Sequence, residues 1–278
     1  AICAAFVFLV TLIFYTDHPR KALFISQEEI NYIYWNRSDN TSKTTKIPWK
    51  ELLLSSAVIA SWISHFGTGF VSFFILSYIP LYFKNVLYLD VKKNGIVSSM
   101  SMLNKFVFRI GSAVLSDRLA TYMSETAVVN IFISIDLGVT AVLLLIVAFL
   151  DCLHSDLAIA LVTLTSGCTG SSISGYGRSY RHMASQFSST LASFGQMAAL
   201  IAEVIVSYIV GALVHPGSLH GWYSAFFLNS GVALFSWLTF MVFGSGLEEK
   251  WARSPQSLTE NTKEDIAEEI KTISDTVV

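Results

Sequence analysis

The sequence has few charged residues. Asp, Glu, Lys and Arg together make up 14% of its 278 residues, against roughly 25% in ordinary soluble domains. A soluble chain of this length has to cover its surface with polar groups, and this composition does not allow that. With a formal net charge of −2, the sequence also lacks the excess of basic residues that favours nucleic-acid binding. The composition therefore excludes a soluble globular fold and predicts no nucleic-acid partner.

Cysteine and catalytic motifs are scarce as well. Cys3, Cys152 and Cys168 are far apart and odd in number, so they form neither the paired spacing of a zinc site nor a disulfide framework. The chain contains no HExxH, no GxSxG and no Walker loop. We therefore predict no metal site, no cofactor and no enzyme activity.

Long apolar runs are what the sequence does contain. Hydrophobic residues make up 53% of it, and its mean hydropathy is +0.56. Six runs are long enough to cross a bilayer, which takes about 20 residues. They cover residues 52–83, 94–116, 127–150, 157–177, 184–214 and 221–246. The pattern predicts an all-α polytopic membrane protein with a six-helix transmembrane bundle over 52–246.

The first apolar run, 1–15, is too short to span a membrane as a helix. It begins without a methionine, a basic segment or a cleavage motif, which argues against a signal peptide. We interpret it as the end of a truncated transmembrane helix, and the whole chain as a fragment.

Basic residues predict the orientation of the bundle. Thirteen Lys and Arg residues lie in the connections 16–51, 117–126 and 178–183 and in the tail 247–278, whereas the opposite side holds three. By the positive-inside rule, the side with thirteen faces the cytoplasm. Arg178 and Arg181 are then interpreted as cytoplasmic anchors.

Two cations lie inside the run 94–116. Lys105 and Arg109 are four residues apart and therefore share one helical face. Each costs about 2.5–3.5 kcal/mol near the bilayer centre. Folding this run back on 127–150 brings Asp136 to the same depth. Two interpretations stay open: an ion pair of Asp136 with one cation, or cations that bind an anion or gate a substrate in an aqueous cavity.

Three further polar residues lie in apolar runs. In "SHFGTGF", two glycines flank Thr68 and weaken the helix near its middle; discontinuous helices often line transport sites. His65 fits either a proton carrier or a hydrogen bond between helices. Glu203 fits either a proton carrier or an ion-pair partner. In 157–177, the many Gly and Ser residues favour close helix packing.

The segment 94–118 ends in small residues followed by Asp117 and Arg118. It resembles the eighth helix and following loop of major facilitator transporters, in which an Asp-Arg pair marks that loop. Other stretches resemble the anion:cation symporter branch, which includes sialin, the vesicular glutamate transporters and the sodium–phosphate cotransporters. They are residues 18–33, 47–56, 75–99 and 221–252.

The resemblance implies a twelve-helix fold of two six-helix halves, with the substrate between them and alternating access. This chain is then the C-terminal half plus the end of the sixth helix, and 16–51 is the loop between halves. The expected function is secondary transport of a small organic or inorganic anion, coupled to H⁺ or Na⁺. The expected location is the plasma membrane or a vesicle or lysosome membrane.

The sequence departs from the family pattern at two places. The vesicular glutamate branch has an arginine at the position of Thr68, which disfavours that branch. Residues 182–187 lack the acid, proline and arginine of the family. A diverged, non-transporting sensor or interaction protein therefore remains a second interpretation. A seven-helix receptor is disfavoured by the long first connection.

Overall fold

The computed structural model describes residues 2–15, 25–36, 47–150, 154–214 and 219–252, which fall into two units, Ala1–Ile47 and Pro48–Val278. Most of the predicted tail 247–278, much of the connection 16–51, and Cys152 lie outside the described residues. The first unit contains α1 (Ile2–Phe14) and α2 (Gln27–Asn36).

The helix α1 has 13 described residues, which span about 20 Å at 1.5 Å per residue, less than the roughly 30 Å of a bilayer core. In α2, Ser26 Oγ accepts a hydrogen bond of 3.2 Å from the backbone nitrogen of Glu29. Glu28 and Glu29 lie in the first turn, where negative charge complements the helix dipole.

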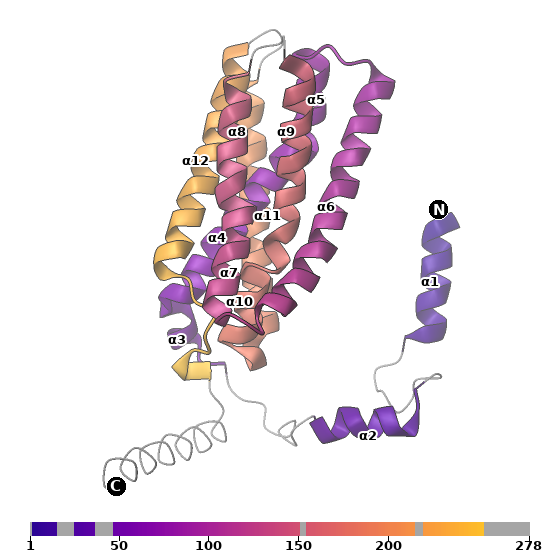
Figure 1. Ribbon diagram of the computed structural model, residues 1–278, viewed down its shortest axis with the longest axis vertical. Helices are drawn as coiled ribbons and strands as arrows, with labels where there is room; N and C mark the ends of the chain where they lie inside the picture. The colour runs from indigo at the N-terminus through magenta and orange to yellow at the C-terminus, as the bar shows by residue number, and fades with distance from the viewer. Residues whose placement is uncertain (1, 16–24, 37–46, 151–153, 215–218, 253–278) are drawn as a thin grey trace. The chain divides into compact units, whose positions relative to one another are not determined.

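The second unit is a bundle in which the long helices run side by side (Figure 1). In order, its elements are α3 (Trp49–Leu54), α4 (Ser56–Ser77), α5 (Ile79–Asn85), α6 (Val91–Leu119), α7 (Glu125–Ile133), the π-helical turn η3 (Ser134–Val139), α8 (Thr140–Ala148), α9 (Ser155–Cys168), η5 (Thr169–Ile173), α10 (Tyr176–Met183), η6 (Ser185–Phe187), α11 (Ser188–Leu213), α12 (Leu219–Phe243) and η7 (Lys250–Ala252). Every element described in it is helical, as the composition predicted.

Five stretches of the described chain are long and apolar enough to cross a membrane. They are Ser56–Asn85, Glu125–Ala148, Ser155–Met183, Ser185–Leu213 and Leu219–Phe243. The sixth predicted run, 94–116, lies in α6, which has 29 residues and is long enough. Its charged residues, including Lys105 and Arg109, leave it less apolar than the other five.

The core of the bundle lies along α4, which packs against α11 and α12. Phe74 of α4 meets Phe226 of α12 edge to face, with ring centroids 5.4 Å apart. Tyr82 of α5 contacts the same Phe226 at 5.1 Å and Trp222 at 5.3 Å. These rings bury large apolar areas and stabilise one end of the bundle.

The predicted discontinuity at Gly67 and Gly69 is wrong, because α4 runs without a break from Ser56 to Ser77. A Cβ atom on Gly69 would lie 2.9 Å from the Cα atom of Ala199 in α11. The glycines therefore let neighbouring helices approach, and this packing offsets the roughly 1 kcal/mol that each costs in a helix. The break comes later, at Tyr78, just before Pro80.

The predicted close packing of the Gly- and Ser-rich segment is confirmed. A Cβ atom on Gly167 would collide with the side chain of Asn104, and one on Gly170 would collide with the backbone oxygen of Lys105. The tighter 3₁₀ turn of η5 belongs to the same contact, since η5 packs on α6. This packing holds the middle of α6 against α9 and η5.

Candidate site in the membrane core

The α-helix between Glu125 and Ala148 is interrupted at its middle by the π-helical turn η3. Gly138 lies against the indole of Trp237, whose Nε1 donates a hydrogen bond of 3.0 Å to Ser134 Oγ. Single π turns of this kind are frequent at functional sites. Here the turn carries Asp136.

Asp136 is fully buried, with 0% of its surface exposed. Thr68 Oγ1 lies 2.7 Å from Asp136 Oδ2 and 3.1 Å from the backbone oxygen of Ser64. The second carboxyl oxygen, Oδ1, has no hydrogen-bond partner among the described residues. The structure thus brings together two of the predicted site residues, Thr68 and Asp136, and leaves the carboxyl half satisfied.

Lys105 is the fifteenth of the 29 residues of α6, so it lies at the middle of its helix. Its Nζ donates a hydrogen bond of 3.1 Å to Ser72 Oγ. Ser72 follows Thr68 by four residues on α4, one helical turn further along the same face. Lys105 and Asp136 interact electrostatically at longer range.

The ion pair considered between Asp136 and Lys105 or Arg109 is not formed in this structure. The ion pairs within 4.0 Å in the described part of the chain all involve Arg178 or His182. Arg109 is exposed, whereas Lys105 is partly buried. The two cations share a face, and neither forms an ion pair with a carboxylate of the described residues.

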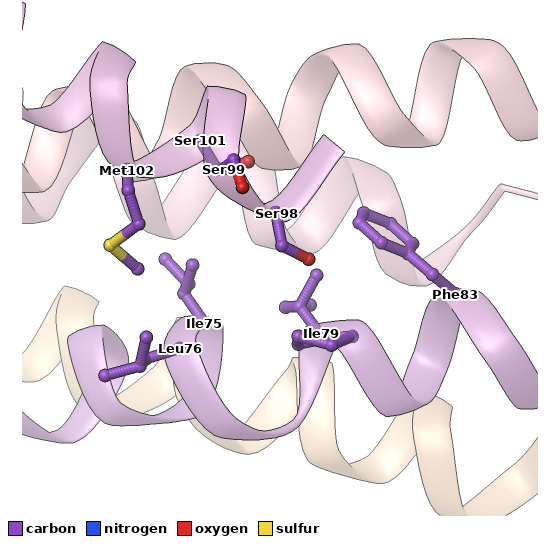
Figure 2. Close-up of a pocket in the computed structure, with 9 residues that line it drawn as sticks. Ile75, Leu76, Ile79, Phe83, Ser98, Ser99, Ser101 and Met102 are labelled. Carbon is purple, nitrogen blue, oxygen red and sulfur yellow. The ribbon is translucent and has the colours of Figure 1, made fainter. Parts of the chain in front are cut away.

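A cavity of about 190 Å³ opens between α4–α5 and α6, one turn from Lys105. Figure 2 shows side chains of α4 and α5 facing side chains of α6 across it, with Ile75 and Ile79 opposite Ser98 and Met102. Ser101, which also lines it, precedes Lys105 by four residues on α6. The cavity is mainly apolar, with serine hydroxyls along α6.

His65 lies three residues before Thr68 on α4 and stacks on Tyr176 of α10, with ring centroids 4.2 Å apart. The hydroxyl of Tyr180 is 3.5 Å from His65 Nδ1. A Cβ atom on Gly195 would collide with both groups, so α11 passes closely over this contact. The geometry agrees with the interpretation of His65 as a contact between helices, and the two tyrosines were not predicted.

Glu203 lies apart from these contacts on α11 and is partly buried. Its backbone oxygen accepts a hydrogen bond of 2.6 Å from Ser207 Oγ. Among the described residues, its carboxylate takes part in no recorded hydrogen bond or ion pair. Both of its predicted roles, proton carrier and ion-pair partner, therefore stay predictions.

Arg178 is the buried centre of a charge cluster that the sequence interpretation missed. It is only 6% exposed, and its Nη1 lies 2.7 Å from Asp117 Oδ1. Its Nε and Nη2 donate bonds of 2.7 and 3.1 Å to the two carboxylate oxygens of Glu125, the bidentate geometry that guanidinium groups favour. His182 Nε2 is 3.4 Å from Glu125 Oε2.

This charge cluster joins the end of α6, the start of α7 and α10. Arg118, the second residue of the Asp-Arg signature, is exposed. The signal for the cluster was present, because Asp117, Glu125 and Arg178 all fall on the side predicted to be cytoplasmic. Opposite charges on one side of a bundle are candidates for pairing across connections.

Comparison with known proteins agrees with this architecture. The sequence profile described as Major Facilitator Superfamily matches residues 1–203. The chain belongs to the Major Facilitator Superfamily. This confirms the resemblance carried by the segment that ends in Asp117 and Arg118, and the all-α, polytopic character of the fold follows the superfamily pattern.

Among curated members of the superfamily, human sialin is 26% identical over 89% of this chain and 50% of its own length. Vesicular glutamate transporter 3 of Danio rerio is 27% identical over 90% of this chain and 44% of its own length. A putative inorganic phosphate cotransporter of Drosophila melanogaster is 25% identical over 86% and 46%. The chain thus spans about half the length of the superfamily relatives it matches, and these relatives belong to the branch named from the sequence.

Proposed function

We propose that the full-length protein carrying this chain is a secondary transporter of a small organic or inorganic anion. It works by alternating access between two six-helix halves, of which this chain is the C-terminal one, and it is coupled to H⁺ or Na⁺. It is not an enzyme. The names of its relatives, which are transporters of this branch, support the assignment.

Lys105 is the observation that carries the proposal. Its ammonium group lies at the middle of α6 and has a serine hydroxyl as its hydrogen-bond partner. A cation without a counter-ion in the membrane interior costs about 2.5–3.5 kcal/mol. A bound anion offsets this cost, so the site favours a negatively charged substrate over a neutral one.

Arg109 and the neighbouring cavity support the same role. Arg109 lies one turn from Lys105 on the same face and adds positive potential. The cavity of about 190 Å³ ends one turn from Lys105. It is smaller than the roughly 300–1,000 Å³ of common ligand pockets, which fits a small anion or one wall of a site completed by the other half.

The exposed apolar surfaces of two helices support a location in a membrane. On α6, Leu103, Phe106 and Ile110 expose 62%, 59% and 52% of their surface. On α11, Leu200 and Val204 expose 52% and 70%. Apolar faces of this extent contact lipid or another membrane segment. The protein is integral to the plasma membrane or to a vesicle or lysosome membrane, with 16–51, 117–126, 178–183 and the tail in the cytoplasm.

Uptake by the full-length protein in cells tests the proposal, with radiolabelled L-glutamate, inorganic phosphate and glucuronate as probes. Lys105→Gln should lower uptake of the transported probe by about tenfold or more, because a hydrogen bond to a charged group is worth about 1.5–3 kcal/mol. The matched control is Lys92→Gln, which removes an exposed lysine at the start of the same helix. Equal uptake by both variants, at equal surface expression, would refute the role of Lys105.

A further inference from the structure

The hydroxyl of Thr68 lies within hydrogen-bond distance of two oxygen atoms. Its oxygen is close to two groups, Asp136 Oδ2 at 2.7 Å and the backbone oxygen of Ser64 at 3.1 Å. A hydroxyl has a single proton to donate. If Asp136 is ionised, both neighbours are acceptors, and the Thr68 hydroxyl can donate to only one of them, while the Ser64 oxygen keeps the helical N–H of Thr68. If Asp136 carries a proton, it donates to Thr68 Oγ1, which donates to Ser64, and both contacts are satisfied.

The surroundings of Asp136 are unsuited to a permanent negative charge. An ionised buried carboxylate is stabilised by two or three donors, whereas Oδ1 has no partner in the described part of the protein. The nearest cation, Lys105, is held by Ser72 rather than by Asp136. At the middle of a 24-residue span, neutralisation by a proton is the least costly state.

The titratable groups around Asp136 are few. Lys105 of α6, Cys168 at the end of α9 and Tyr176 of α10 interact with it electrostatically. Of the elements packed against η3, α4 adds His65, α7 has Glu125 at its far start and α9 has Asp156 at its far start. The helix α12 has His220 and Tyr223 in its first turns, and α8 and η5 have no titratable residue. Lys105 is therefore the cation best placed to exchange with a proton at this carboxyl.

We propose that Asp136 is the proton-carrying group of the transport cycle and that Lys105 sets its occupancy. When the substrate anion pairs with the Lys105 ammonium group, the Asp136 carboxyl is protonated and donates a hydrogen bond to Thr68 Oγ1. When the anion leaves, the Lys105 side chain turns from Ser72 toward Asp136. The Asp136 carboxyl then releases its proton to water and forms an ion pair with Lys105. The movement is about one helical turn, within reach of a flexible lysine stem. This inference rests on the proposed function and deepens it.

The coupling is reciprocal by linkage, since anion binding and proton binding each favour the other. One proton enters with one anion on one side of the membrane, and both leave on the other. For a monovalent anion, the summed charge of Lys105, Asp136 and the bound anion stays at zero in both states.

The test uses the full-length protein in proteoliposomes, with the membrane potential clamped by potassium and valinomycin. The probe is whichever of L-glutamate, inorganic phosphate and glucuronate the wild type exchanges. A pH gradient of one unit should concentrate a monovalent probe anion by up to about tenfold for one coupled proton. Asp136→Asn, which keeps the shape of the side chain, should give no accumulation while still exchanging labelled for unlabelled probe.

Two variants serve as comparisons. Thr239→Ala removes an exposed helical hydroxyl bonded within α12 and should accumulate the probe as the wild type does. Glu203→Gln removes the other acid in the membrane. If Glu203→Gln loses accumulation and Asp136→Asn keeps it, or if a sodium gradient rather than a pH gradient drives accumulation in the wild type, the inference is overturned.

Failure of the proposed function is distinguishable. If the wild type neither exchanges nor accumulates any probe, anion transport is refuted and the proton role falls with it. If the wild type transports and Asp136→Asn accumulates tenfold, only the proton role is refuted. Should Asp136→Asn fail to fold, Thr68→Val replaces it. That variant removes a hydrogen bond that stabilises the ionised carboxylate more than the protonated one. Half-maximal uptake should therefore shift by about one pH unit toward alkaline pH, and an unshifted profile would overturn the inference.

Discussion

Replacing Arg178 should destabilise the protein more than any other single change on the cytoplasmic side. Its guanidinium is 6% exposed and donates to Glu125 through two nitrogens, at 2.7 and 3.1 Å, and to Asp117 through a third, at 2.7 Å. Arg178→Gln removes the charge and leaves the Glu125 carboxylate, whose side chain is 28% exposed, without its bidentate partner.

The two carboxylates should contribute unequally. The Asp117 side chain is 78% exposed, so solvent screens its pair, which is worth about 0–1 kcal/mol. The bidentate pair with the less exposed Glu125 accounts for most of the effect. Breaking a buried ion pair from one side costs about 3–5 kcal/mol. We expect a loss in this range for Arg178→Gln and at most about 1 kcal/mol for Asp117→Asn.

Thermal unfolding of the full-length protein in detergent, followed by fluorescence size-exclusion chromatography, measures the difference. A loss of 3–5 kcal/mol lowers Tm by about 10 °C for a chain of this size. Arg181→Gln is the matched control, because Arg181 is exposed on the same short helix, and its Tm should stay near that of the wild type. If both arginine variants unfold at the same temperature, the cluster contributes nothing and the reasoning fails.

Two other predictions concern packing and orientation. Gly69→Ala should lower Tm by several degrees, because its methyl group would meet the backbone of Ala199 at 2.9 Å and overpacking costs about 1–3 kcal/mol. Gly111→Ala is the control and should not lower Tm, because its methyl group would meet nothing within 4 Å. Equal stability of the two variants would contradict the close contact at Gly69. If the protein is in the plasma membrane, a cysteine at Tyr88, which is 85% exposed, should react with an impermeant maleimide on intact cells. A cysteine at Tyr122, which is 87% exposed, should react only after permeabilisation, and the opposite pattern would reverse the proposed orientation.

The depth of the polar residues in the membrane was predictable from the sequence. Lys105 is the central residue of α6, and Asp136 lies at the middle of the span Glu125–Ala148, as folding the two runs back on each other indicated. Depth depends on the number of residues along a helix and on its rise per residue, which are local quantities. The signature Asp117 and Arg118 likewise identified the superfamily from residues adjacent in the chain.

The partners of those residues were not predictable. Similar depth made Lys105 or Arg109 the expected partner of Asp136, yet the structure pairs Asp136 with Thr68 and Lys105 with Ser72. The π-helical turn at Ser134–Val139 changes the direction in which the Asp136 side chain points from its helix. We found no pattern in the sequence that predicts such a turn. Arg178 was misread for a related reason, because its burial depends on carboxylates from two other helices.

The sequence by itself therefore determined the class of protein, its all-helical fold and the superfamily. Each of these follows from composition, run length and local motifs. Only the tertiary structure decided which of the polar residues inside the membrane meet, since that depends on the rotation of each helix about its axis and on the order of helices around α4. The two glycines beside Thr68 illustrate the difference: they suggest a weak helix in the sequence, and they allow α11 and α12 to pack closely on an unbroken one in the fold.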